Sequence, residues 1–209
     1  MASKPTWPGA GTEIVSAVDS TVRRPRADAL RNSDAVLAAA ITVFKDKGVE
    51  APVKEIADRA GVGVGTLYRH YPRRSDLIKA VFQREVDTCA DAAATLVANE
   101  EPLAALRRWM DRYVELIATK RGLAGTLHSG DPAFDTLADY FVTRLEPALA
   151  SLLKAAAASG DIRSDIAAED LMRAVANVCQ PAETVGIAYS LRMVALLVDG
   201  LRFGAKASR

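Results

Sequence analysis

The chain has 209 residues, of which 27 are Lys or Arg, 26 are Asp or Glu, and half are hydrophobic. This length and apolar content allow one or two domains with hydrophobic cores, and the near-neutral balance excludes a uniformly basic nucleic-acid binder. Residues 1–84 nevertheless hold 14 Lys and Arg against 9 Asp and Glu, whereas residues 85–209 hold 13 against 17, which indicates a basic binding module joined to an acidic one.

The cysteines and the hydropathy pattern narrow the class of protein further. Cys89 and Cys179 are the only cysteines and lie far apart, which is typical of a reducing compartment and unlike a disulfide framework or a zinc site. No apolar run approaches the length of a membrane span, and the first residues lack the apolar core of a secretory signal. We therefore expect a cytoplasmic protein that does not cross a membrane.

Residues 1–29 are predicted to be a disordered N-terminal arm, because three prolines and two glycines interrupt any periodic pattern. Arg23, Arg24 and Arg26 make the end of this arm basic. Such arms can reach DNA phosphates or an adjacent minor groove, and the alternative is a tail that is merely solvated.

A first helix is predicted to start near Ser33 or Asp34, either of which can cap it, and to end at Gly48. Two shorter helices follow in residues 53–72. In Val53–Ala60 the apolar residues recur with helical spacing, Gly61 permits a sharp turn, and a second helix runs from Val64 until Pro72 ends it. Two short helices joined by a glycine turn predict a helix-turn-helix unit, whose second helix enters the DNA major groove.

The segment Gly61-Val-Gly-Val-Gly-Thr-Leu-Tyr-Arg-His-Tyr-Pro72, followed by Arg74-Ser-Asp-Leu-Ile-Lys79, closely resembles the helix-turn-helix signature of TetR-type transcriptional regulators. The resemblance covers roughly residues 30–84. It implies an all-α protein with a three-helix DNA-binding domain at 30–75 and a helical ligand-binding and dimerisation bundle at 76–209. Gly63 departs from the family, which often has a small polar residue there, and one possible hydroxyl contact to DNA is lost with it.

Polar and basic side chains of this segment are the expected DNA contacts. Arg69 can read guanine in the major groove, and the phenol, hydroxyl and imidazole of its neighbours supply further donors. Lys54 and Lys79 are placed to neutralise phosphates, and by resemblance Tyr68, His70 and Lys79 touch the DNA backbone. The full candidate set is Arg23, Arg24, Arg26, Lys54, Gly63, Val64, Gly65, Thr66, Tyr68, Arg69, His70 and Lys79. Tyr71 is expected in the core.

Four other interpretations of the chain compete with this one. A phosphate-binding glycine loop needs a preceding strand or a Gly-Lys-Ser/Thr ending, and neither is present. A helical hairpin without a DNA role leaves the polar residues of the second helix unexplained. A protein-binding adaptor on the same fold is the main alternative function. An enzyme is disfavoured, since His128, Ser129 and Asp131 are adjacent in sequence without thereby forming a triad, and we expect no catalytic residue, metal site or cofactor.

The second domain is predicted to be a series of helices. One helix, which Ser75 can cap, runs to about Ala98 and links the two domains, and Asn99 caps the next, which ends at Gly122. A short helix at Leu123–Leu127 and a loop at 128–132 precede a long helix from Ala133 to Ala158, kinked or broken at Pro147. The last two helices span about 167–180 and 183–203.

This bundle should contain an effector cavity and a dimer face. Candidate cavity residues are aromatic, polarizable or polar side chains, namely Trp109, Tyr113, His128, Phe134, Tyr140, Phe141, Met172, Asn177 and Cys179, with ordinary core packing as the alternative for each. The last helix carries a heptad-like apolar seam, suited to pairing with a second copy or to the internal core. The candidate dimer residues are Leu171, Val175, Val178, Ile187, Leu191, Val194, Val198 and Leu201.

The resemblance also implies a mechanism. A homodimer binds a palindromic operator in double-stranded DNA, and an unknown small-molecule effector in the C-terminal bundle displaces the linking helix. The two reading helices then no longer match successive major grooves, so that a repressor is released. The effector must prefer the DNA-incompetent state, and the coupling between the two ligands is reciprocal.

Overall fold

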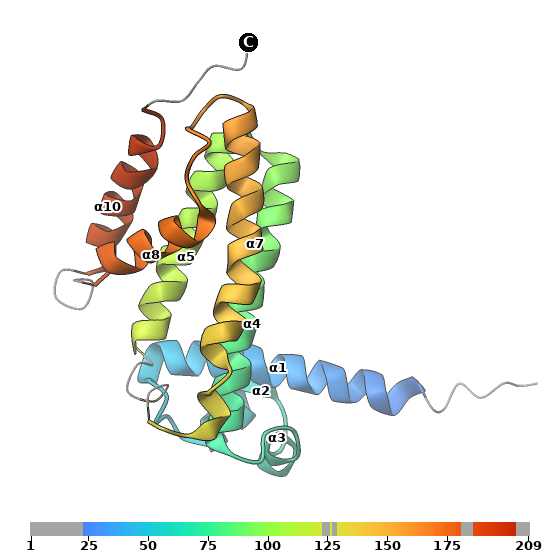
Figure 1. The fold of residues 1–209 in the computed structure, drawn as a ribbon. Helices are drawn as coiled ribbons and strands as arrows, with labels where there is room; N and C mark the ends of the chain where they lie inside the picture. Colours follow the sequence, from blue (N-terminus) through green and yellow to red (C-terminus); the bar gives the residue numbers. More distant parts are fainter. Residues whose placement is uncertain (1–22, 123–125, 127–128, 181–185, 204–209) are drawn as a thin grey trace, which may run out of the picture.

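The structure of the chain is a computed structural model that describes residues 23–122, 126, 129–180 and 186–203. Every regular element in these residues is a helix, which confirms the all-α prediction. The order is α1 (Arg23–Lys47), α2 (Val53–Ala60), α3 (Val64–His70), α4 (Arg74–Asn99), α5 (Pro102–Gly122), the 3-10 helix η1 (Pro132–Phe134), α7 (Leu137–Ala158), α8 (Ala168–Val178) and α10 (Ile187–Gly200). Helices α1 to α3 form one end, and α4, α5 and α7 run side by side away from it (Figure 1).

Helix α1 begins at Arg23, not near Ser33, so the predicted disordered arm is wrong for residues 23–29. Figure 1 shows this end of α1 extending past the other helices. The proline that suggested disorder lies in the first helical turn, where its missing N–H has no intrahelical partner, and the Arg, Ala and Leu residues after it favour a helix. The three basic residues Arg23, Arg24 and Arg26 are thus helical. Residues 1–22 of the predicted arm lie outside the described part of the chain.

The remainder of α1 supports the other two helices of the N-terminal domain. Val36, Ala40 and Val43 are buried at helical spacing, and α1 packs against α2, α3 and α4. Gly48 ends the helix as predicted, with a φ of 78° and its N–H donating to the Phe44 carbonyl at 3.0 Å. Only glycine takes this backbone conformation without steric cost, so the end of α1 is fixed by the sequence.

Helix α4 belongs to both domains, because it contacts α1 at one end and packs along α5 and α7 over the rest. It begins one residue before the predicted cap Ser75: Arg73 is the N-cap, and the carboxylate of Asp76 accepts its backbone N–H at 3.1 Å. The prediction that Asn99 caps the following helix is also wrong. Asn99 is the last residue of α4, and its amide donates to the Thr95 carbonyl at 2.7 Å, within its own helix.

The long helix predicted from Ala133 to Ala158 is divided, but not at Pro147. The carboxylate of Asp131 accepts the backbone N–H of Ala133 at 2.9 Å, which stabilises the separate 3-10 turn η1, and α7 starts only at Leu137. Pro147 lies inside the continuous α7 at an exposed position. The neighbouring Leu145 and Leu149 are fully buried, so core packing keeps the helix intact despite the lost hydrogen bond.

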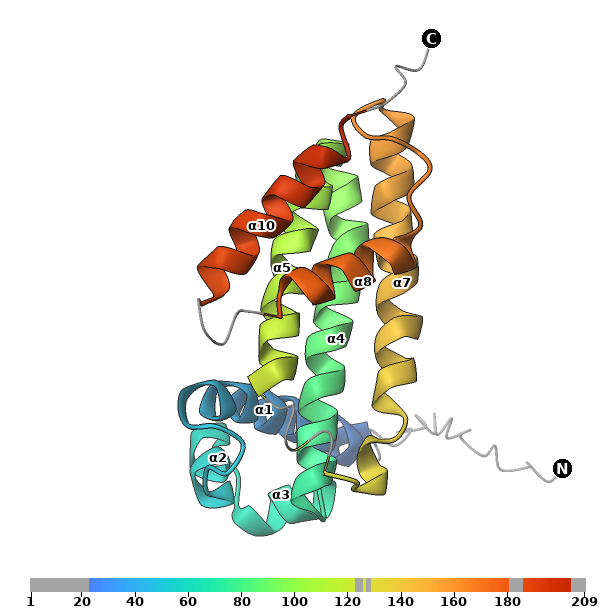
Figure 2. The same cartoon turned by 60° about the vertical axis from the view of Figure 1, so that its left-hand side comes forward.

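Helices α8 and α10 cover the C-terminal bundle. Figure 2 shows α8 lying across the bundle, where it contacts α5, α7 and α10, and α10 packing along α5. The predicted helix at Leu123–Leu127 and the predicted start of the last helix at Glu183 fall on positions that the structure does not describe. In the described ranges no helix is long and apolar enough to cross a membrane, and no group of His, Cys, Asp and Glu could hold a metal ion.

Candidate functional site

The turn between α2 and α3 depends on Gly61. Its φ of 68° and ψ of 27° are left-handed, and its N–H donates to carbonyls of the last turn of α2. The N–H of Val62 donates to the Ala57 carbonyl at 3.0 Å, which completes the helix end. A Cβ added at Gly61 would meet no atom within 4 Å, so the requirement for glycine comes from the backbone angle and not from lack of space.

Two side chains hold α3 against the rest of the domain. Leu67 is 1% exposed and belongs to the hydrophobic core. Tyr71, predicted to lie in the core, packs partly buried against it, and its hydroxyl lies 2.9 Å from the hydroxyl of Ser33 on α1. Because these two contacts fix one side of a seven-residue helix, the opposite side is left facing solvent in a defined orientation.

The solvent-facing side of α3 carries most of the residues predicted to read DNA. Tyr68 is 48% exposed, Arg69 is exposed, and Val64 is 36% exposed, while Thr66 and His70 are half-buried beside them. His70 packs near Tyr71, with ring centroids 6.3 Å apart. The structure therefore brings these five predicted residues together on one short helix at the end of the molecule.

Gly63 and Gly65 flank the start of α3 and do not need to be glycine for the fold. Gly63 has an ordinary φ of −69° as the N-cap, and the nearest atom to a Cβ there is the Thr66 hydroxyl oxygen at 4.0 Å. A Cβ at Gly65 would also meet open space. Both are exposed, so what glycine provides at these positions is a bare backbone that another molecule can approach closely.

The two predicted phosphate-binding lysines differ in their surroundings. Lys54 is exposed on α2, and within the described residues neither it nor Arg69 has a carboxylate partner. Lys79 is half-buried on α4, and its ammonium donates to the Thr136 hydroxyl at 3.4 Å, next to the start of α7. Lys54 and Arg69 are thus cations without a carboxylate partner in the described part of the chain, whereas Lys79 also contacts the C-terminal domain.

The two arginines after Pro72 have roles that were not predicted. Arg74 turns inward and donates to the backbone carbonyls of Val49 and Ala51, the latter at 2.6 Å, so it joins the α1–α2 loop to the start of α4. Arg73 stays exposed and pairs with Asp76 at 2.7 Å, and this hydrogen bond raises the pKa of Arg73 and lowers that of Asp76. The sequence gives no signal for which of two adjacent arginines faces inward.

Five of the predicted effector-binding residues form one buried cluster. Trp109 stacks on Tyr113 with ring centroids 5.5 Å apart, and Tyr113 lies 6.0 Å from Phe141. The Trp109 indole N–H donates to the Cys89 carbonyl at 2.8 Å, and the Tyr113 hydroxyl donates to the Met172 carbonyl at 3.4 Å. Burial raises the pKa of Tyr113, with the thiols of Cys89 and Cys179 adding to the effect, and burial raises that of Cys89 to about 12.

The other four predicted effector residues lie outside these ring and hydrogen-bond contacts. Phe134 is buried in η1. Tyr140 is half-buried on α7 and donates its hydroxyl to Asp87 on α4. Asn177 is exposed at the end of α8, and His128 lies outside the described residues. The structure thus divides the predicted cavity residues among four places, and the clustered ones pack directly against one another.

The residues of the predicted dimer seam are mostly buried within the single chain, which favours the internal-core alternative. Leu171, Val175, Val194, Val198 and Leu201 are at most 6% exposed within the single chain, and Val178 and Leu191 are partly buried against the same core. The reason is that α10 packs its heptad-like seam against α5, with an ion pair between Arg107 and Asp199 across the same contact. Of the predicted set, only Ile187 is well exposed, at 40%.

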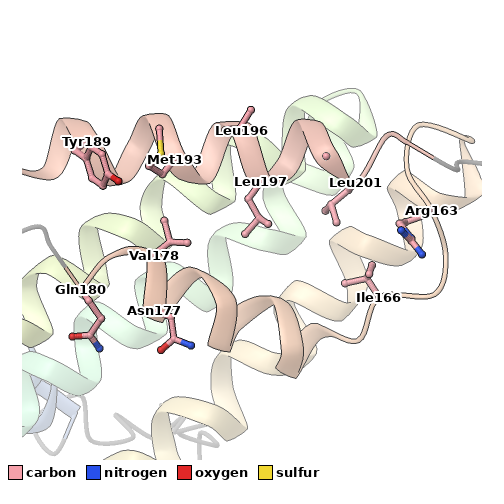
Figure 3. A pocket seen from close by; sticks show the side chains of 11 residues that line it. Arg163, Ile166, Asn177, Val178, Gln180, Tyr189, Met193, Leu196, Leu197 and Leu201 are labelled. Carbon is pink, nitrogen blue, oxygen red and sulfur yellow. The ribbon is translucent and has the colours of Figure 1, made fainter.

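An open groove of about 690 Å³ lies between α8 and α10 instead (Figure 3). Tyr189, Met193 and Leu197 line it from α10, with Val178 from α8. Its other lining residues are Arg163, Ile166, Asn177, Gln180, Leu196, Gly200 and Leu201. Leu196 is 64% exposed, so α10 presents an apolar surface to solvent on the side away from α5.

Two anchored short helices with a glycine turn, an exposed polar face on the second and free cations beside it define a helix-turn-helix DNA-binding protein. Residues 36–81 match the family model described as bacterial regulatory proteins of the tetR family. Residues 101–203 match the model for the C-terminal domain of SbtR-like transcriptional regulators. The chain belongs to the TetR family of transcriptional regulators, whose members are regulators and not enzymes.

Individual relatives agree with this assignment. The chain is 37% identical to a TetR transcriptional regulator from Streptomyces coelicolor, with a TM-score of 0.70 over 81% of this chain and 98% of that one. It is 35% identical to a TetR regulatory protein from Mycobacterium vanbaalenii, with a TM-score of 0.66 over 85% and 99% of the two chains. An HTH-type transcriptional regulator from Staphylococcus aureus is 41% identical over 64 residues, which is 30% of this chain and only 35% of that protein.

Proposed function

We propose that this regulator is a homodimeric repressor that binds a palindromic operator and leaves it when a small molecule enters the C-terminal bundle. The observation that carries this proposal is the continuity of α4. One unbroken helix, Arg74–Asn99, starts beside α3 and ends in the C-terminal bundle. A change of its tilt at the bundle end therefore moves the reading helix at the other end, which is the coupling that an effector needs.

On the operator, α3 lies in the major groove and Arg69 is the main base-reading residue. Its guanidinium is exposed and matches the two acceptors of guanine. Tyr68, Thr66 and His70 supply donors for bases or phosphates, and the bare backbone at 63–65, with Val64, approaches the DNA closely. Lys54 and Lys79 neutralise phosphates, and the helical extension with Arg23, Arg24 and Arg26 adds positive charge beside the duplex.

The dimer forms through the exposed outer surface of α10 and the groove beside it. Ile187 and Leu196 are exposed apolar residues on α10, and Met193 lines the groove between α8 and α10. A second copy that covers this surface removes apolar area from water and fixes the distance between the two α3 helices. One helix-turn-helix domain alone buries too little surface for tight binding, so this spacing is part of the recognition.

The effector site is the cluster around Tyr113. Trp109, Tyr113, Phe141 and Met172 come from α5, α7 and α8, so a molecule that separates them moves α5 and α7, which pack directly on α4. The cluster is apolar except for a few polar groups such as the Tyr113 hydroxyl and the Trp109 indole N–H. These features favour a mostly apolar effector with one or two hydrogen-bonding groups.

Selection of duplexes from a random-sequence library with the full-length protein tests the proposal. We expect inverted repeats whose half-site centres lie about 34–36 Å apart, or a multiple of that distance, as two symmetric reading helices require. A compound screen on the selected duplex should then identify molecules that release it. A protein-binding adaptor on the same fold, the alternative function, would enrich no sequence at all.

A further inference from the structure

A polar ladder joins α4 to α7 at the level where the two domains meet. The Asp87 carboxylate accepts the Tyr140 hydroxyl at 2.7 and 2.8 Å and the Arg144 Nε at 2.6 Å. The second arm of the Arg144 guanidinium donates to Asp91 at 2.8 Å. Asp87 and Asp91 are one turn apart on α4, and Tyr140 and Arg144 are one turn apart on α7, so two successive turns of each helix are paired.

The ladder continues towards the N-terminal domain. Arg84, almost one turn before Asp87 on α4, donates to the Asp34 carboxylate on α1 at 2.9 Å. Asp34, Arg84, Asp87, Asp91 and Tyr140 all line one open cleft of about 450 Å³. The Arg84–Asp34 contact with α1 and the Asp87–Tyr140 contact with α7 therefore lie along a single cleft.

These contacts are suited to setting a helix position and contribute little to overall stability. The Asp87 and Arg144 side chains are each 38% exposed, and exposed ion pairs are worth little to folding because water and salt screen them. The remaining α4–α7 contact is mostly apolar and includes Phe82 and Phe141, whose rings lie 6.2 Å apart. Apolar packing is not directional, whereas a carboxylate that accepts two donors from one helix accepts them in one relative position only.

We propose that Asp87 is a positioning residue whose carboxylate holds α4 in one register against α7 and so sets the tilt of the DNA-binding domain. An effector that moves α7 relative to α4 must break the hydrogen bonds of Asp87 with Tyr140 and Arg144, so these bonds oppose the movement. The helix register is a property of the single chain, whereas its consequence for DNA affinity rests on the proposed function.

Spin-label distance measurement in the full-length chain tests the register directly. Labels at Asp58→Cys on α2 and Lys154→Cys on α7 use exposed positions, while the native Cys89 and Cys179 are buried. Doubly labelled chains are diluted into unlabelled chains, so that only distances within one chain contribute. We expect one narrow distribution in the parent and a broadened or displaced one in Asp87→Asn and Arg144→Gln, with helical content unchanged.

The matched control is Arg108→Gln. Arg108 also pairs with a carboxylate at 2.6 Å, that of Glu100, but this contact joins α5 to the far end of α4. The control should keep the narrow distribution, and the double variant Asp87→Asn/Arg144→Gln should change the distribution by less than the sum of the two single variants, because both remove the Asp87–Arg144 contact. Unchanged distributions in Asp87→Asn and Arg144→Gln, or equal broadening in Arg108→Gln, would overturn the positioning role.

A second measurement separates this inference from the proposed function. On the selected duplex, Asp87→Asn and Arg144→Gln should change affinity by about threefold or more, while Arg108→Gln should not. A changed distance distribution in a protein that selects no duplex would support the register and contradict the DNA-binding proposal. A changed distribution with unaltered affinity would show that α4 register does not control DNA binding and would overturn that part of the inference.

Discussion

The hydroxyl groups of Ser33 and Tyr71 lie 2.9 Å apart and connect α1 to the residue that ends α3, the second helix of the helix-turn-helix unit. The two residues are 38 positions apart in sequence, and the contact is partly buried. It therefore fixes the end of a short helix that has only Leu67 as a fully buried anchor.

Removing this contact should loosen α3 without unfolding the chain. Tyr71→Phe keeps the ring and deletes one hydroxyl, so we expect a loss of about 0.5–1.5 kcal/mol in the free energy of unfolding, the net worth of one hydrogen bond. Ser33→Ala should give a similar loss, and the double variant should lose little more than either single one. Urea denaturation measures all three, and additive losses would show that the hydroxyls do not interact.

Replacement of Gly61 by alanine should lower stability, whereas the same replacement at Gly63 should leave stability unchanged. Gly61→Ala places a side chain at a φ of 68° and should cost about 1–2 kcal/mol of stability. Gly63→Ala has an ordinary φ and open space, so its stability should stay near the parent value. If DNA approaches the backbone there, Gly63→Ala should instead weaken operator binding by about tenfold, roughly 1.4 kcal/mol. Thermal melts and binding titrations distinguish the two effects.

Arg74 and Arg73 form a second matched pair. Arg74→Ala removes the donor to the Val49 and Ala51 carbonyls and should destabilise the N-terminal domain by about 1–3 kcal/mol. Arg73→Ala removes only an exposed ion pair with Asp76 and should have a much smaller effect. Equal losses in the two variants would contradict the inward role of Arg74.

The N-terminal domain was largely predictable because its signals are local. The apolar spacing in Val53–Ala60 and the glycine after it depend on neighbouring residues only, and both helices of the motif appear where expected. The start of α1 was not predictable in the same way, since Pro25 suggests a break but is compatible with a first turn. The inward turn of Arg74 depends on a loop more than 20 residues away.

In the C-terminal domain, the sequence pattern alone does not determine which surface an apolar helix face contacts. An apolar seam such as Val194 and Val198 has the same spacing whether it meets a partner chain or another helix of its own chain. Only the tertiary arrangement places it against α5 and leaves Leu196 exposed on the other side. For the same reason Tyr113 and Phe141 could be recognised as buried aromatic residues, but not as neighbours.

Two substitutions on α10 test the proposed dimer face. Val194 is 1% exposed, so Val194→Asp should unfold the C-terminal domain or destabilise it by several kcal/mol. Leu196 is 64% exposed, so Leu196→Asp should leave the chain folded and convert the dimer to a monomer. Circular dichroism and sedimentation velocity give the two readouts. A folded dimer in Leu196→Asp would place the contact elsewhere.

The most direct test of the DNA-binding surface is a titration of the selected duplex with Arg69→Ala and Tyr68→Ala, beside Arg108→Ala as a control that removes the same charge far from α3. Each α3 variant should lose about 1–3 kcal/mol of binding free energy, the scale of one good base or phosphate contact, with unchanged helical content. The control should bind like the parent. Parental affinity in both α3 variants would contradict the assignment of α3 as the reading helix.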